Sequence, residues 1–192
     1  MNKVSKTILI IASLLLLLMY VFPVWSITLE APQYPEGLGM YIWINDITGH
    51  NPNDLNNINL VNHYIGMKDI DPQSFPEFKI IPYVVFFIIA FGLFTAIKGG
   101  NKMLLVWIGV FVVLALIGLY DFYQWNYDYG HNLDIEKAAI KIPNMTYQPP
   151  LFGRKTILNF TAYSFPALGG IAAFVSILLG MVSYYIEAKK SR

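Results

Sequence analysis

The chain has 192 residues, of which 56% are hydrophobic and only 13% are charged, and its formal net charge is +1. Soluble domains are about a quarter charged, so this composition excludes an ordinary soluble protein and indicates an integral membrane protein. The few basic residues offer no surface for nucleic acid, and the lack of cysteine excludes disulfides, thiolate metal sites and c-type haem attachment.

Four apolar windows have the length of membrane spans, which need about 20 residues to cross a hydrocarbon core about 30 Å thick. We predict spans over residues 7–25, 80–97, 103–120 and 163–185. The first span is expected to be an uncleaved anchor, because no small-x-small cleavage site follows it. The predicted fold class is an all-α integral membrane protein with four transmembrane helices, forming a single membrane domain over residues 1–192.

The distribution of charged residues predicts how the chain crosses the membrane. The two ends and the short connection between the second and third spans hold seven of the 13 basic residues. The loops over residues 26–79 and 121–162 hold eleven of the 12 acidic residues. We therefore expect both termini in the cytoplasm and both loops on the periplasmic side of a bacterial inner membrane. The cores of spans two to four contain no ionisable side chain, which argues against a transport pathway.

The first outer loop is predicted to form a small β-hairpin followed by a short helix. Polar and apolar residues alternate over Ser26–Glu30 and Leu38–Ile44, with two prolines and a glycine between them. The helix would start near Asp54 or Asn57 and continue through Met67. In such a helix His63 and Met67 lie four residues apart on one face, with Cβ atoms about 5–6 Å apart.

The second outer loop is predicted to run over the membrane surface. Its aromatic residues at 121–132 are typical of an interface belt, and a turn at Gly130–Asn132 would present His131 to the outside. Residues 134–139 are expected to make one or two helical turns. Three prolines at 142–150 exclude regular structure and would hold Met145 in an extended segment. Residues 151–160 are read as an interfacial stretch returning to the membrane.

These loops contain a candidate copper site. Imidazole and thioether ligands favour Cu(I) over magnesium or calcium, so His63, Met67, His131 and Met145 are the predicted metal ligands. Met40 is expected to pack in the hairpin core, and His50 is expected to be solvated. The alternative is that the four histidine and methionine side chains serve only in packing.

Four segments resemble those of a small bacterial, Bacteroidetes-type membrane-protein family that accompanies nitrous-oxide reductase accessory genes. They are residues 29–38 (LEAPQYPEGL), 58–67 (INLVNHYIGM), 127–134 (YDYGHNLD) and 145–151 (MTYQPPL). The resemblance implies a part in maturing a periplasmic copper enzyme, and it covers the four predicted ligands. The implied partners are a periplasmic copper chaperone or an apo copper enzyme, besides the lipid bilayer and other membrane subunits.

Two functions follow from this reading. The first is a membrane-anchored accessory factor that binds or hands over copper on the periplasmic side. The second is a structural subunit that scaffolds a membrane complex and has no metal role. An enzyme is not expected, because the sequence contains no phosphate-binding loop, nucleophile elbow, zinc-protease helix or dinucleotide fingerprint.

Overall fold

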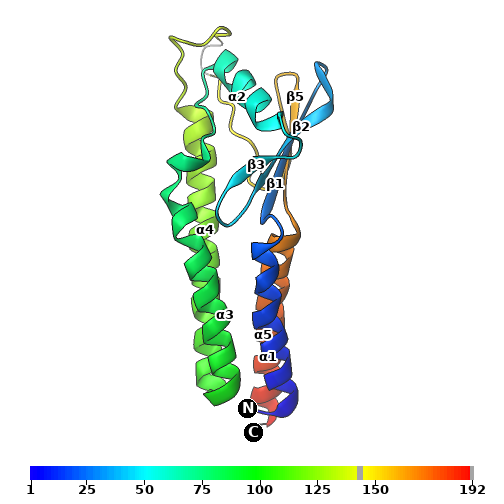
Figure 1. Ribbon diagram of the computed structural model, residues 1–192, viewed down its shortest axis with the longest axis vertical. Helices are drawn as coiled ribbons and strands as arrows, with labels where there is room; N and C mark the ends of the chain where they lie inside the picture. The colour runs from blue at the N-terminus through cyan, green and yellow to red at the C-terminus, as the bar shows by residue number, and fades with distance from the viewer. Residues whose placement is uncertain (142–144, 191–192) are drawn as a thin grey trace.

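The protein consists of a bundle of four helices and a β-sheet domain stacked on one end of it (Figure 1). The computed structural model describes residues 1–141 and 145–190. Its long helices are α1 (Lys3–Leu15), continued by the 3-10 helix η1 (Leu16–Tyr20), α3 (Ile81–Lys98), α4 (Asn101–His131) and α5 (Leu168–Lys190). Each of these four segments is long and apolar enough to cross a membrane, in agreement with the four predicted spans.

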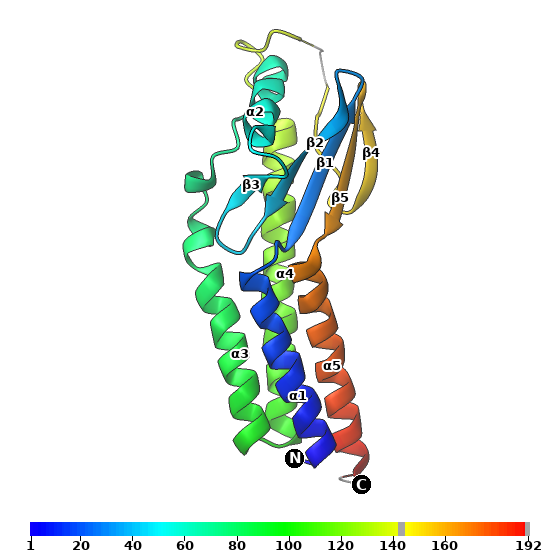
Figure 2. The ribbon, with the colours of Figure 1, turned by 45° about the vertical axis from the view of Figure 1, so that its right-hand side comes forward.

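The β-sheet contains five antiparallel strands in the order β3-β2-β1-β5-β4. The strands are β1 (Trp25–Ala31), β2 (Tyr34–Ile42), β3 (Ile47–Gly49), β4 (Gly153–Ile157) and β5 (Phe160–Pro166). Helix α2 (Asp54–Ile65) and the upper part of α4 cover one side of this sheet (Figure 2). Two short 3-10 helices, η2 (Pro72–Ser74) and η3 (Pro76–Lys79), lead down to α3.

The prediction of an all-α fold with only a small hairpin is wrong, because the protein is a mixed α/β structure. The predicted hairpin is present as β1 and β2, joined by a tight turn at Pro32 and Gln33. A lone hairpin is marginally stable, and its exposed edges need partners. The second outer loop supplies one of them: β5 pairs with β1, and β4 pairs with β5. Residues 153–166 are therefore strands, and the last long helix begins at Leu168.

Helix α4 is also longer than predicted, with 31 residues that extend well beyond position 120. Its upper end packs against the sheet, where Phe122, Trp125 and Tyr129 join a hydrophobic core that includes Ile27 and Met40. These three aromatics are spaced at three and four residues, so they share one face of the helix. They belong to this core, in contrast to the interface belt that we expected. Residues 134–139 form a turn, and no helix occurs there.

The four helices meet around Trp107 of α4, whose side chain is fully buried. Its indole N–H donates a hydrogen bond to the Ile88 carbonyl of α3 at 2.9 Å. Glycines allow this close contact: a Cβ atom at Gly92 would lie 2.8 Å from the indole nitrogen, and one at Gly180 would lie 2.6 Å from the indole ring. The bundle core is thus fitted around one large side chain.

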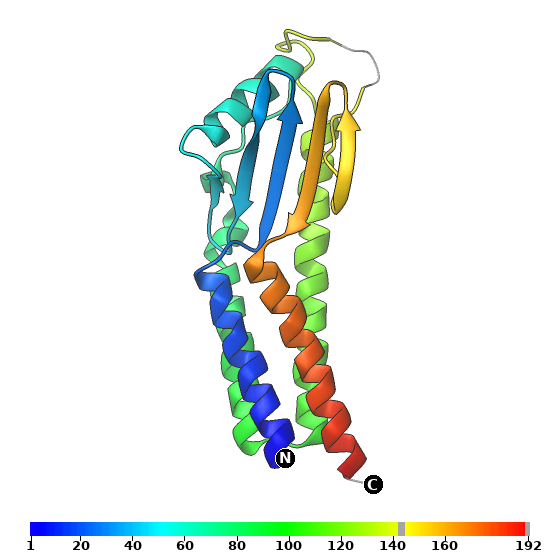
Figure 3. The ribbon, with the colours of Figure 1, turned by 90° about the vertical axis from the view of Figure 1, so that its right-hand side faces the viewer.

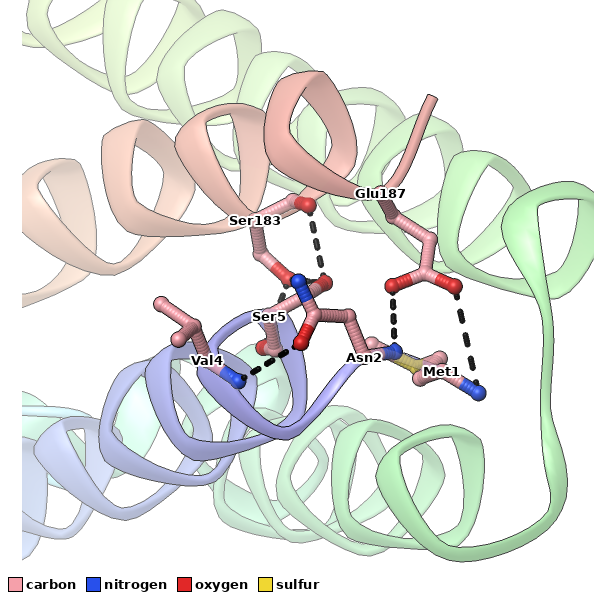
Figure 4. A network of polar contacts seen from close by, with 6 residues as sticks. All are labelled: Met1, Asn2, Val4, Ser5, Ser183 and Glu187. Atoms are coloured by element: carbon pink, nitrogen blue, oxygen red, sulfur yellow. Dashed lines mark hydrogen bonds and ion pairs between the residues drawn. The ribbon is translucent and has the colours of Figure 1, made fainter. Parts of the chain in front are cut away.

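Helices α1 and α5 are held together by buried serines near the two termini (Figure 4). The Ser5 hydroxyl donates to the Ser183 carbonyl at 2.8 Å, and the Ser183 hydroxyl donates to the Ser5 carbonyl at 2.9 Å. Glu187 accepts a hydrogen bond from the backbone N–H of Asn2 at 2.6 Å. Small polar residues let apolar helices approach closely and link their backbones, so this pair of helices forms a tight unit.

We expect Gly92→Ala to lower the free energy of unfolding by about 1–3 kcal/mol, because its Cβ would also lie 2.1 Å from the Ser13 hydroxyl. Gly109→Ala in α4 is the matched control, since a Cβ there meets no atom within 4 Å. The control should leave stability unchanged or raise it by up to about 1 kcal/mol through helix propensity. Unfolding of both variants in detergent measures the difference, and equal stability would contradict the packing described for Trp107.

Candidate functional site

The predicted copper ligands His63 and Met67 do not lie on one helical face. Helix α2 ends at Ile65, and Gly66 follows with a φ of 78°, in the left-handed region that glycine adopts readily. The backbone N–H of Met67 then bonds back to the Asn62 carbonyl at 2.9 Å. Met67 packs, half-buried, against the hydrophobic core of the sheet domain, whereas His63 is exposed on α2. Their four-residue spacing therefore does not place them on a shared helical face.

His131 is the last residue of α4, where the prediction placed a turn. Its ring stacks on Tyr127 at 3.9 Å between centroids, and Nδ1 lies 2.9 Å from the Tyr127 carbonyl. Because a carbonyl can only accept, Nδ1 carries a proton in this contact, and in the neutral ring the lone pair is then on Nε2. This is the tautomer in which a histidine can bind a metal through Nε2.

Backbone contacts gather the segments that carry the four predicted ligands. The Gly66 carbonyl accepts from Asp134, and the Tyr64 carbonyl accepts from Ile140, so the end of α2 is tied to the loop after α4. The Gly130 carbonyl accepts from Tyr147, two residues after the half-buried Met145. The hydrogen bonds and aromatic contacts over residues 1–141 and 145–190 join none of the four side chains to another. Ile142, Pro143 and Asn144, part of the predicted extended segment, lie outside the described residues.

The sheet has a second side that no helix in the described part of the chain covers, and we call it the open face (Figure 3). Strand alternation and register place eleven residues on the open face: Ser26, Thr28, Glu30, Gly39, Tyr41, Thr48, Arg154, Thr156, Thr161, Tyr163 and Phe165. Trp43 and His50 contact Tyr41 and therefore lie beside it on the same face. The opposite residues, such as Ile27, Leu38 and Met40, fill the core beneath α2, so Met40 is packed as predicted.

Aromatic side chains on the open face are held in place by specific contacts. The His50 ring lies over Tyr41 with centroids 4.0 Å apart, and its Nε2 lies 3.0 Å from the Ser26 hydroxyl. Gly39 makes room for this ring, since a Cβ there would lie 2.0 Å from the imidazole Nδ1. The Trp43 indole bonds to the Thr48 hydroxyl at 2.9 Å. His50 is thus half-buried and packed, in contrast to the solvated residue that we expected.

A second cluster on the open face lies across β1, β5 and β4. The Tyr163 hydroxyl donates to Glu30 at 3.0 Å, and the Arg154 guanidinium lies over the Tyr163 ring at 5.6 Å from its centroid. Phe165 is 43% exposed and contacts Phe152 edge to face. A sheet face with Tyr, Trp, Phe and Arg has the composition of a protein-binding surface.

The open face was not predicted because the residues of β4 and β5 were assigned to an interfacial stretch (151–160) and to the fourth span (163–185). The signal that was available is the alternation in residues 161–165, where Thr161, Tyr163 and Phe165 alternate with small Ala162 and Ser164. This period of two predicts a strand. We instead predicted that the fourth span begins at residue 163.

No acidic, histidine or cysteine cluster with three or more members suited to a metal ion occurs among the residues that the structure describes. A site of two histidines and two thioethers falls outside that class of clusters. No protein-family model matches the chain, and no curated protein or solved structure matches it either. The resemblance to the nitrous-oxide reductase accessory family therefore stays a prediction.

The copper prediction requires that His63→Ala and Met67→Leu both weaken Cu(I) binding. We choose leucine because Met67 packs in a core, and leucine keeps its volume while removing the thioether sulfur. Competition with a colorimetric chelator measures the affinity of the purified protein in detergent, and thermal unfolding checks the fold. Met40→Leu is the matched control, since Met40 is 4% exposed in the same core and is not a predicted ligand. Unchanged affinity in both test variants would rule out the predicted site.

Burial lowers the pKa of His50, and the nearby carboxylate of Asp54 opposes the shift. A histidine with a pKa lower in the folded than in the unfolded state binds fewer protons when folded. We therefore expect the contribution of His50 to stability to be complete above about pH 6.5 and to be lost as the pH falls through its folded pKa. Melting temperatures between pH 8 and 5 should fall for the wild type and fall less for His50→Gln. Identical slopes for the two proteins would contradict the buried position of His50.

Proposed function

We propose that this chain is a membrane-anchored accessory subunit that docks an extracytoplasmic protein on the open face of its sheet. The observation that carries the proposal is a set of aromatic side chains held by specific contacts on the open face, which no helix of the described residues covers. Aromatic and arginine side chains dominate binding energy at protein interfaces. Here Tyr41, His50, Tyr163 and Arg154 are already fixed by neighbours, which reduces the conformational entropy lost on binding.

The membrane location of the bundle is part of this proposal. Its support is the length and apolar character of four helices, together with their exposed apolar side chains such as Phe86, Val113 and Phe174. An exposed apolar surface of this extent is what a lipid environment requires. With the positive-inside orientation, the sheet domain lies outside the cytoplasm and both termini lie inside.

Copper handling is a second candidate function, favoured by one observation. The segments that carry His63, Met67, His131 and Met145 are tied together at one end of the sheet domain, and Nδ1 of His131 is held by the Tyr127 carbonyl, which leaves Nε2 outside this hydrogen bond. In this case the docked protein would be a copper chaperone or an apo copper enzyme such as nitrous-oxide reductase. The docking proposal does not require copper. If the chain binds no copper, docking on the open face makes it a scaffold subunit.

Photo-crosslinking tests the docking proposal directly. A p-benzoylphenylalanine at position 28, in the middle of the open face, should give one crosslinked adduct of defined mass in membranes of the native host. The same photoreactive residue at position 60 is the matched control, because Leu60 is 49% exposed on α2, the helix on the opposite side of the sheet.

The yield of this adduct should also depend on the side chains of the open face. We expect Tyr163→Ala combined with Arg154→Glu to reduce the yield at position 28 several-fold, because Tyr163 pairs with Thr28 on the adjacent strand and Arg154 pairs with Tyr163 on the strand beyond it. Affinity measured between the purified partner and the purified variants should change in the same direction. Equal adducts from positions 28 and 60, or a yield that the double variant leaves unchanged, would contradict docking on the open face.

A further inference from the structure

A cavity of about 80 Å³ lies inside the sheet domain, on the side of the sheet opposite the open face. Its walls come from the inner face of the sheet, from α2 and from the upper part of α4. Ile27, Met40, Ile58 and Val61 contribute apolar surface, and no Asp, Glu, Lys, Arg or His lines the cavity. An ion would be expensive to bury in such surroundings, so the cavity suits a neutral, largely apolar molecule.

Two residues that line the cavity carry a buried polar atom without a hydrogen-bond partner among the described residues: the indole N–H of Trp125, a donor, and the side-chain oxygen of Asn126, an acceptor. Asn126 of α4 is 0% exposed, and its Nδ2 donates to the Phe122 carbonyl at 3.1 Å. This bond fixes which end of the amide is the nitrogen and leaves Oδ1 as a buried acceptor. Oδ1 has no hydrogen-bond partner among the described residues. A buried acceptor without a donor is unfavourable, and a leucine of similar size would avoid the problem in an apolar wall.

The edge of the cavity shows a second unusual feature. Leu158 lines the cavity and has a φ of 56°, in the left-handed region that leucine rarely adopts. It is the first of two residues that connect Ile157 of β4 with Phe160 of β5, a position where glycine or asparagine is usual. The turn thus keeps an unfavourable backbone conformation at the point where an apolar side chain borders the cavity.

We propose that this cavity binds a small neutral molecule that is largely apolar and donates one hydroxyl hydrogen bond to Oδ1 of Asn126. The apolar walls would contact the carbon skeleton, and the hydroxyl would satisfy the one unpaired acceptor. The volume is about half that of a cavity known to hold benzene, so the part of the ligand that enters is about four carbon atoms long. This site is separate from the open face, and its occupancy does not depend on the docking proposal.

A pair of isomers tests the donor requirement, because 1-butanol and diethyl ether have the same atoms and only the alcohol can donate. Both are titrated into the full chain in detergent, with asparagine side chains labelled with ¹⁵N and followed by NMR. The Asn126 amide signals are those missing from Asn126→Leu. We expect 1-butanol to shift these signals with an affinity about three- to tenfold higher than that of diethyl ether.

Two variants make the outcome specific. For Asn126→Leu, binding is followed by saturation-transfer NMR, and the preference for the alcohol should disappear while weak binding of both isomers remains. Val61→Phe fills the cavity from α2 and should abolish the shifts caused by either isomer, with Leu60→Phe on the exposed side of the same helix as its control. Equal affinities in the wild type, a preference that survives in Asn126→Leu, or the absence of shifts from both isomers would overturn the proposal.

Discussion

The pairing of β1 with β5 is the contact on which the rest of the structure depends. Strand β1 follows η1 after four residues, and β5 is separated from α5 by one residue, so the strands continue two helices that are already packed together. The pairing starts at Trp25 and Pro166, directly above the bundle. Gly169 and Gly170 permit it, because Cβ atoms there would lie 2.7 and 2.3 Å from the carbonyls of Phe22 and Val24.

This one pairing joins the two outer loops into a single sheet domain. Hydrogen bonds from Ala167 to Val24 and from Gly169 to Pro23 extend the ladder into the start of α5. The β1–β2 hairpin gains a neighbour on one side, and β3 covers part of the other edge. Helix α4 then contributes to both the bundle and the sheet domain. Its lower half places Trp107 in the bundle core, and its upper half packs Trp125 and Tyr129 against the sheet.

The helical part of the fold was predictable because its signal is local. A run of about 20 apolar residues predicts a span regardless of what it packs against, and alternation over residues 26–44 predicts the first hairpin. The pairing of β1 with β5 depends on residues more than 130 positions apart, as in Thr28 with Tyr163, and no local pattern announces it. Aromatic residues also made the second outer loop hard to assign. Trp125 and Phe165 are as typical of a membrane interface as of a hydrophobic core or an exposed protein surface.

The helical face that His63 and Met67 were expected to share is absent for a similar reason. A four-residue spacing says that two side chains share a face only while the helix continues, and Gly66 ends α2 between His63 and Met67. The left-handed conformation of Gly66 is what ends the helix at this point. Nothing in the sequence singles out Asn126 as a binding residue. It becomes a candidate only when the structure shows that its side-chain carbonyl is buried and has no hydrogen-bond partner.

The direct connection between strands and helices also bears on how the proposed docking would work. His50 bonds to Ser26 of β1, and Tyr163 of β5 bonds to Glu30 of β1, so both aromatic clusters of the open face rest on the strands that continue α1 and α5. A flexible carrier would place its binding surface beyond a linker of small or polar residues. Here Val21–Val24 and Ala167 are the whole connection, and both are tied by backbone hydrogen bonds. A protein docked on this face would therefore be held at a fixed height and orientation above the bundle, which is what a scaffold requires.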